Sequence, residues 1–245
     1  MARSFDGIDD RIDLANEANF DRERTDPFSI AFPFYLPANT SGAYVAKQVN
    51  SGNFEGWSIS NETFEGPRIV FELRNSAGNQ ILREIDVAHA TATWIHVLCT
   101  YSGSSTLAGT KIYLNGAEAA YQAGTADSLS ASILNNVACQ FGCRGGSGAP
   151  GFFHAASLAD GAFWNVELNA TEAHMLGNGA EPSTIRGANQ IALLRLCGTD
   201  SPEIDDWGTN DGTVTGTTTV AHPLNSPSAC NPQPILRTVT SGLRW

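Results

Sequence analysis

Residues 93–116 read TWIHVLCTYSGSSTLAGTKIYLNG. The part up to Tyr101 is rich in aromatic and β-branched residues, which predicts a strand with at least one fully apolar face. A polar loop follows, then Lys111–Leu114 predicts a second strand, and Asn115-Gly116 is a strong signal for a tight turn. Because a lone hairpin is only marginally stable in water, these two antiparallel strands predict a larger sheet covered by a second one.

The two faces of the first strand carry different residues. Trp94, His96 and Leu98 share one face, and the residues that alternate with them, from Ile95 to Tyr101, share the other. Large aromatic side chains in strand patterns are usually buried. We therefore predict that Trp94 is a core residue.

The rest of the chain predicts about eleven short strands in all, separated by turn residues at regular intervals. This pattern favours an all-β, two-sheet antiparallel sandwich. One short helix is expected after Asn169, because Asn169 and Glu172 have the spacing of a reciprocal N-terminal cap. Gly177 is expected to end this helix after two turns.

The composition changes near residue 198, which predicts a boundary there. Residues 1–198 are expected to form the sandwich, and residues 199–245 an Asp/Gly/Thr-rich loop region, a Pro-rich linker and a terminal arm. The terminal ILRTVTSGLRW cannot bury its apolar side chains on itself, so we predict that it attaches to a partner or to a second copy. The residues predicted to make this attachment are Ile235, Leu236, Arg237, Val239, Leu243, Arg244 and Trp245.

Charge and composition exclude several classes of partner. The chain of 245 residues has a formal net charge of −11. It lacks the clusters of Lys and Arg that phosphate groups need, so we expect neither nucleic acid nor an anionic membrane as partner. No apolar run reaches the length of about 18 residues that a membrane-spanning helix needs. The sequence enters its first strand directly, so we expect synthesis in a cytoplasm without a signal peptide. Five cysteines at loose spacing predict buried free thiols.

Several motifs in consecutive order resemble a known family. The pattern W-x-H-V-x-x-T-Y, followed by K-I-Y-L-N-G, resembles the central hairpin of laminin-G-like domains in the concanavalin A-like lectin and glucanase superfamily. Ser4–Asp10, Phe28–Phe32 and Ala159–Leu168 resemble the first, second and last strands of that family. The resemblance spans residues 4–178 and implies a jelly-roll topology for the sandwich. It says less about function, because one fold supports many functions.

Glu84 and Asp86 give a hint of catalysis. Glucanases of the same superfamily carry three alternating carboxylates on one strand, E-x-D-x-(x)-E, and a retaining glycosidase needs two of them as nucleophile and acid. In this chain the third position falls on Ala88 or His89, and neither supplies a carboxylate. We therefore predict that the protein is not an enzyme and that Glu84 lies on a polar strand face.

The resemblance also implies a candidate metal site. Laminin-G-like domains often bind one calcium ion at the rim of the sandwich, and calcium prefers oxygen ligands. The candidate ligands are Asp6, Asp9 and Asp160, with Asp10 beside them. The alternative is that Asp6-Gly7 makes a turn and Asp9 caps the backbone. No other cofactor is predicted.

Aromatic residues in or near loops are the candidates for contact with a glycan, because sugars stack on exposed rings. We take Trp57 and Trp207 as the candidate glycan ligands, with Phe64 as a further exposed aromatic.

These observations predict a non-catalytic structural or binding protein. The opening M-x-x-S-F-D-G and the later W-G-x-N-D-G-T resemble bacteriophage virion proteins. That resemblance implies a capsid decoration, spike or tail component, made in the host cytoplasm and assembled with other virion proteins and with itself. The alternative is a carbohydrate- or calcium-dependent binding module of a bacterial surface protein. A virion component that contacts host-surface glycans satisfies both, and a glycan hydrolase ranks below them.

Overall fold

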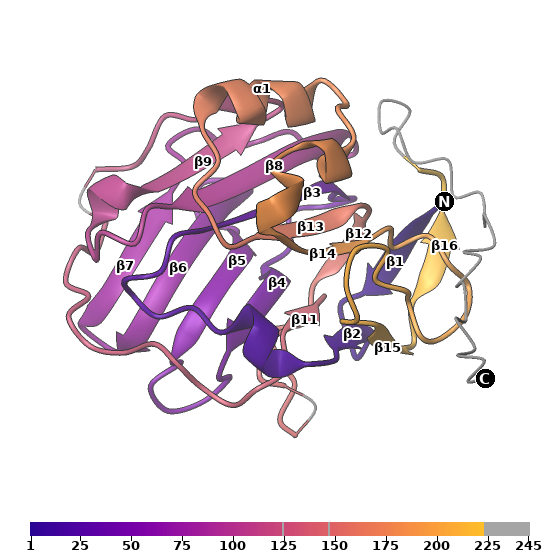
Figure 1. The fold of residues 1–245 in the computed structure, drawn as a ribbon, viewed down its shortest axis with the longest axis horizontal. Helices are drawn as coiled ribbons and strands as arrows, with labels where there is room; N and C mark the ends of the chain where they lie inside the picture. The colour runs from indigo at the N-terminus through magenta and orange to yellow at the C-terminus, as the bar shows by residue number, and fades with distance from the viewer. Residues whose placement is uncertain (124, 147, 223–245) are drawn as a thin grey trace, which may run out of the picture.

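A computed structural model describes residues 1–123, 125–146 and 148–222, which form two packed antiparallel sheets (Figure 1). The nine-stranded sheet has the order β10-β9-β8-β3-β12-β1-β16, with β13 paired to β3 and β14 paired to β13. The seven-stranded sheet has the order β15-β2-β11-β4-β5-β6-β7. Each sheet joins a run of consecutive strands, β8 to β10 in one and β4 to β7 in the other, to strands from distant parts of the sequence. The prediction of an all-β jelly-roll sandwich is confirmed.

The strands are β1 (Ala2–Asp6), β2 (Arg11–Leu14), β3 (Phe28–Tyr35), β4 (Gly42–Gln48), β5 (Gly56–Glu62), β6 (Arg68–Ser76), β7 (Asn79–Glu84), β8 (Trp94–Tyr101), β9 (Thr110–Leu114), β10 (Ala117–Glu118), β11 (Gln140–Phe141), β12 (Ala155–Leu158), β13 (Gly161–Trp164), β14 (Gln190–Leu194), β15 (Gly212–Thr215) and β16 (Thr218–Val220). The helix α1 spans Ala170–Gly177, and 3-10 turns span Glu17–Phe20, Leu107–Gly109, Pro182–Thr184 and Gly187–Asn189. No helix in the part of the chain that the structure describes has the length and hydrophobicity to cross a membrane.

The predicted hairpin is present as β8 and β9, but its faces are the reverse of the prediction. The side chains from Ile95 to Tyr101 that alternate with Trp94 belong to the main core between the sheets. Trp94 is only half-buried and packs against Tyr35, with ring centroids 5.8 Å apart. The prediction that Trp94 is a core residue is wrong because both faces of β8 carry apolar groups. Leu98, on the outer face, packs in a second small core.

The second core lies between the nine-stranded sheet and α1, which rests on the outside of β8 and β9 (Figure 1). Its largest member is the fully buried Trp164, whose indole Nε1 donates to the Ile185 carbonyl at 2.7 Å. The helix begins with the predicted reciprocal cap, in which Asn169 accepts from the Glu172 backbone and Glu172 accepts from the Asn169 backbone.

The sandwich extends past the predicted boundary at residue 198. Strand β15 pairs with β2, and β16 pairs with β1, so residues through Val220 contribute to both sheets. The loop before β15 is organised by Asp205, whose Oδ1 accepts from the backbone of Leu193 and of Trp207. Its Oδ2 accepts from the backbone and the side chain of Asn210. The predicted arm, from Ile235 to the end of the chain, lies outside the described residues.

The cysteines follow the prediction in part. Three of them are buried free thiols, but Cys197 is disulfide-bonded, so the prediction of free thiols is wrong for that residue. The free thiols are Cys99, Cys139 and Cys143.

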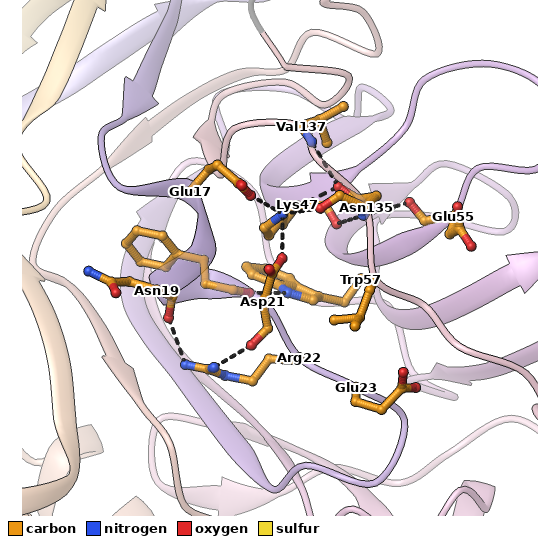
Figure 2. A network of polar contacts seen from close by, with 12 residues as sticks. Glu17, Asn19, Asp21, Arg22, Glu23, Lys47, Glu55, Trp57, Asn135 and Val137 are labelled. Carbon is orange, nitrogen blue, oxygen red and sulfur yellow. Dashed lines mark hydrogen bonds and ion pairs between the residues drawn. The ribbon is translucent and has the colours of Figure 1, made fainter.

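A buried lysine connects strand β4 to two neighbouring loops. Lys47, at the end of β4, is 1% exposed. Figure 2 shows Glu17 and Asp21 pointing toward its ammonium group, at 2.8 and 2.7 Å from Nζ. The carbonyl of Asn135 accepts a hydrogen bond from Nζ at 2.8 Å. Two ion pairs and a hydrogen bond to a carbonyl therefore surround the ammonium group, which ties two loops to the strand end and compensates the buried charge.

Candidate ligand-binding site

The predicted metal ligands do not all meet. The carboxylates of Asp6, Asp9 and Asp10 come within 4.8 Å of one another at the β1–β2 turn. Asp160 lies near the opposite end of β1, because Asp6 pairs with Ala155 and the chain then runs away from it along β12. Asp160 is buried there, forms an ion pair with Arg195 and shares a hydrogen bond with His222. The assignment of Asp160 to this cluster is wrong, and Asp10 takes its place.

Backbone hydrogen bonds occupy the acidic turn. Asp6 Oδ1 accepts from the backbone N–H of Ile8 at 2.7 Å and of Asp9 at 3.3 Å, and the first of these bonds lowers the pKa of Asp6. Asp10 Oδ2 accepts from the Asp6 backbone, and burial raises the pKa of Asp10. The turn at Asp6-Gly7, given above as part of the alternative to a calcium site, is present, but the side chains that cap the backbone are those of Asp6 and Asp10 instead of the predicted Asp9.

The predicted glycan ligands separate into one buried and one exposed residue. Trp57 is 2% exposed and donates its Nε1 proton to the Phe20 carbonyl at 3.2 Å, so its assignment as a glycan ligand is wrong. The reason is that Trp57 is near the start of β5 and its side chain points into the main core. Trp207 is 43% exposed, and Phe64, at the tip of the β5–β6 turn, is 74% exposed.

The outer face of the seven-stranded sheet offers a different site. Along β6, Ile69 and Phe71 pack in the main core, so the residues that alternate with them point outward. Val70 points outward on β6, and it pairs with Ser60 on β5 and with Glu84 on β7. Paired residues lie on the same face of a sheet, so Ser60 and Glu84 also point outward. These outward residues come from β5, β6 and β7, so the face spans three adjacent strands.

Small residues on this face are buried although they point away from the core. Ala46, Ser58 and Ser60 are 0%, 2% and 5% exposed. Residues that face outward stay buried only where other side chains lie over them. Four half-buried side chains gather over this face and are called here the arginine–phenylalanine layer: Phe54, Arg74, Arg144 and Phe152.

The layer alternates rings and cations. The guanidinium carbon of Arg144 lies 4.7 Å from the centroid of the Phe54 ring and 4.5 Å from that of Phe152. Arg74 lies over the same Phe54 ring at 5.0 Å. A guanidinium over the face of an aromatic ring is attracted by the ring quadrupole. Both phenylalanines have left-handed backbone, with φ of 55° and 54°, which a bulky residue adopts only when its surroundings hold it there.

Neutral amides anchor Arg144. Its Nη1 donates to Gln48 Oε1 and its Nε to Asn50 Oδ1, both at 3.1 Å. Among the described residues no carboxylate lies within 4 Å of this guanidinium. Burial lowers the pKa of Arg144, and the charges of Glu72 and Glu62 oppose this shift.

Carboxylates border the layer. Glu72 accepts from Gln48 Nε2 at 2.8 Å and from Arg74 Nη1 at 3.4 Å. Glu62 ends β5 on the same face, and burial raises its pKa while the charge of Arg144 opposes the rise. The site therefore brings together guanidinium donors, amide and carboxylate acceptors and two aromatic rings.

Glu84 and Asp86, the two residues that hinted at catalysis, have different surroundings. Glu84 is the last residue of β7 and forms an ion pair with Arg68, 3.6 Å from its Nη1. Burial raises the pKa of Glu84, and Arg68 opposes the rise. Asp86 follows the strand and is exposed.

Comparison with known proteins places this geometry in a family. A laminin-G-like family model, described as concanavalin A-like lectin/glucanases superfamily, matches residues 6–174. No curated protein matches the sequence significantly. Among solved structures, a putative carbohydrate binding protein from Bacteroides ovatus aligns with a TM-score of 0.60 at 17% identity, over 89% of this chain and 58% of its own.

Two further structures share the fold. The CBM40 of the Ruminococcus gnavus IT-sialidase has a TM-score of 0.52 at 11% identity, over 72% of this chain and 98% of its own. The heptameric SAP-like pentraxin from Limulus polyphemus has a TM-score of 0.50 at 11% identity, over 72% of this chain and 81% of its own. The family match covers more than half of the sequence and agrees with the two-sheet topology. This chain therefore belongs to the concanavalin A-like lectin/glucanases superfamily.

Proposed function

We propose that this chain is a non-catalytic glycan-binding module whose ligand binds at the arginine–phenylalanine layer. The observation that carries the proposal is Arg144, held between two rings and bonded to the same Gln48 side chain as the Glu72 carboxylate. Ligand sites combine apolar or aromatic surface with a few fixed polar groups. A saccharide has the matching surfaces, because its C–H faces pack on rings and its hydroxyls both donate and accept.

The relatives support this class of ligand. The Bacteroides structure is titled a putative carbohydrate binding protein, and the Ruminococcus CBM40 was also solved bound to α2,3 sialyllactose. The chain spans 58% of the length of the first of these, so only a module-level function is inferred from it.

Replacing Arg144 by glutamine should weaken glycan binding about tenfold or more, because a charged hydrogen bond contributes about 1.5–3 kcal/mol. A glycan array followed by titration calorimetry measures this. Trp207→Ala is the comparison variant, because Trp207 is the predicted glycan ligand that is exposed. This variant should leave binding unchanged. Loss of binding in Trp207→Ala with full binding in Arg144→Gln would move the site to the loop at Trp207.

The bound glycans should be recovered intact. Glu84 is held by Arg68, and no third carboxylate follows it on β7 to serve as acid/base. Chromatography of β-glucans and of the array ligands after long incubation tests this. Hydrolysis that disappears in Glu84→Gln would make the protein a glycosidase.

We also propose, on the sequence resemblance, that the module is part of a bacteriophage virion and reaches host-surface glycans there. Mass spectrometry of purified particles tests this location. If the purified particles do not contain this chain, the proposed location in the virion is wrong, whereas the proposal of glycan binding is unaffected.

A further inference from the structure

We infer that Lys47 and Asn135 form an intramolecular amide bond, which the folded chain makes by itself. The bond joins Lys47 Nζ to Asn135 Cγ, and the side-chain nitrogen of Asn135 is released as ammonium. It ties the end of β4 covalently to the segment before β11, 88 residues away in the sequence. The inference does not depend on the proposed glycan site, which lies on the other face of the sheet.

The nucleophile is an amine that points between the two sheets. Lys47 pairs with Trp57 across β4 and β5, and paired residues lie on the same face of a sheet. Trp57 belongs to the main core, so Lys47 also points inward. At 1% exposure the amine is shielded from bulk water and held among its neighbours. A lysine amine becomes a nucleophile once a nearby base has removed a proton from it.

Two carboxylates lie within reach of that proton. Glu17 Oε2 and Asp21 Oδ1 are 2.8 and 2.7 Å from Lys47 Nζ, which is the range for direct proton transfer. Both oxygen atoms are buried and, apart from this ion pairing, have no hydrogen-bond partner among the described residues. Figure 2 shows both side chains directed at Nζ. They are therefore placed to accept protons from the amine.

The side-chain amide of Asn135 is the group that the amine attacks. Its Oδ1 lies 3.4 Å from Lys47 Nζ and also accepts from the Val137 backbone N–H at 3.1 Å. That donor stabilises the negative charge that develops on Oδ1 during the attack. Its Nδ2 donates to the Lys47 and Glu55 carbonyls at 3.2 and 3.0 Å, which holds the amide beside the amine. An uncharged amide takes a nucleophile more readily than either carboxylate, whose negative charge repels the electron pair.

The reaction balances as a transamidation. The lysine ammonium loses two protons to the carboxylates, one before the attack and one after it, and its electron pair forms the Nζ–Cγ bond. The bond from Cγ to Nδ2 then breaks, and Nδ2 takes up two protons and leaves as ammonium. Glu17 and Asp21 return to their initial state, and nothing is oxidised or reduced.

Mass spectrometry of the folded, purified chain tests the bond. After reduction of its disulfide, the chain should weigh about 17 Da less than its sequence predicts, because ammonia is lost. Trypsin should yield peptide 25–68, uncleaved after Lys47, joined to peptide 112–144. Lys47→Arg keeps the charge but removes the amine, so this variant should have the mass that its sequence predicts. Combining Glu17→Gln with Asp21→Asn should slow bond formation about a hundredfold, because the bases are gone.

Matched controls separate this bond from other losses of mass. Lys111→Arg, at the ion pair with Glu118, and Asn136→Ala, at the exposed neighbour of Asn135, should both keep the loss. Melting curves confirm that each variant is folded, and the peptide map of the parent locates the bond without any variant.

Three results would overturn the inference. The first is a folded parent chain with the full mass of its sequence. The second is a loss of about 17 Da that persists in Lys47→Arg, which would mean that an asparagine has cyclised on its own backbone. The third is a loss of about 18 Da, the mass of water, which would place the bond on a carboxylate instead of Asn135.

Discussion

Replacing Arg3 by methionine should lower the free energy of unfolding by about 3–5 kcal/mol, because it leaves a buried carboxylate without its partner. Arg3 is 1% exposed and Glu203 is 4% exposed, with Nε and Oε2 2.9 Å apart. The guanidinium also donates to the Thr217 hydroxyl and to the Asp200 carbonyl. Urea unfolding measures the loss as a lower midpoint.

Two further variants make this result specific. Arg3→Met combined with Glu203→Leu should recover most of the loss, since a well-packed apolar pair can replace a buried ion pair. Lys111→Met removes the exposed ion pair with Glu118 and should change stability by no more than about 1 kcal/mol. The Arg3 pair joins the first strand to the segment before β15. A loss below about 1 kcal/mol in Arg3→Met would mean that this segment is not packed on the sandwich, as the sequence boundary at residue 198 implied.

The fold could be predicted because its signals are local and repeated. The hairpin at Trp94–Leu114, its Asn-Gly turn and the cap at Asn169 each specify backbone conformation within a few residues. The side of β8 that faces the core could not be predicted in this way. Helix α1 covers part of the outer face, and Leu98 is as apolar as the residues on the inner face. Strand alternation identifies the buried side only when the other side meets water.

The end of the sandwich also escaped prediction. Residues 212–220 contain five Thr and two Val, which favour short strands, but nothing local shows that these strands join the sandwich. They form β15 and β16 by pairing with strands near the start of the chain. Edge strands of this kind depend on tertiary partners more than on their own propensity.

The candidate site was missed because its members are far apart in the sequence. Phe54 lies in the loop between β4 and β5, whereas Arg144 and Phe152 lie in the loop between β11 and β12. The segment that Arg144 begins is rich in glycine, which predicts a flexible loop. One local signal was present: Ser58 and Ser60 alternate as small residues on a central strand. Small residues at outward positions leave room for a layer above the sheet, which is what the structure places there.

Trp164→Ala should also reduce stability by about 3–5 kcal/mol, the usual range for truncating a fully buried tryptophan. Trp164 fills the small core under α1, and its loss leaves the Ile185 carbonyl without the indole donor. Trp94→Ala is the matched variant on the outside of the same sheet and should cost about 1 kcal/mol, because Trp94 is half-buried and keeps one ring contact, with Tyr35.

The difference between the stability losses of these two variants shows which part of the outer face of the nine-stranded sheet is shielded from water. Leu168, Leu176 and Ile185 pack with Trp164, so its cavity would open inside a closed cluster that cannot collapse easily. Trp94 stands beyond the end of that cluster, where water can fill the space left by its ring. Thermal unfolding of both variants gives the comparison directly. Equal losses would mean that α1 and its neighbours cover the whole face, and a larger loss for Trp94→Ala would reverse the assignment of the two faces of β8.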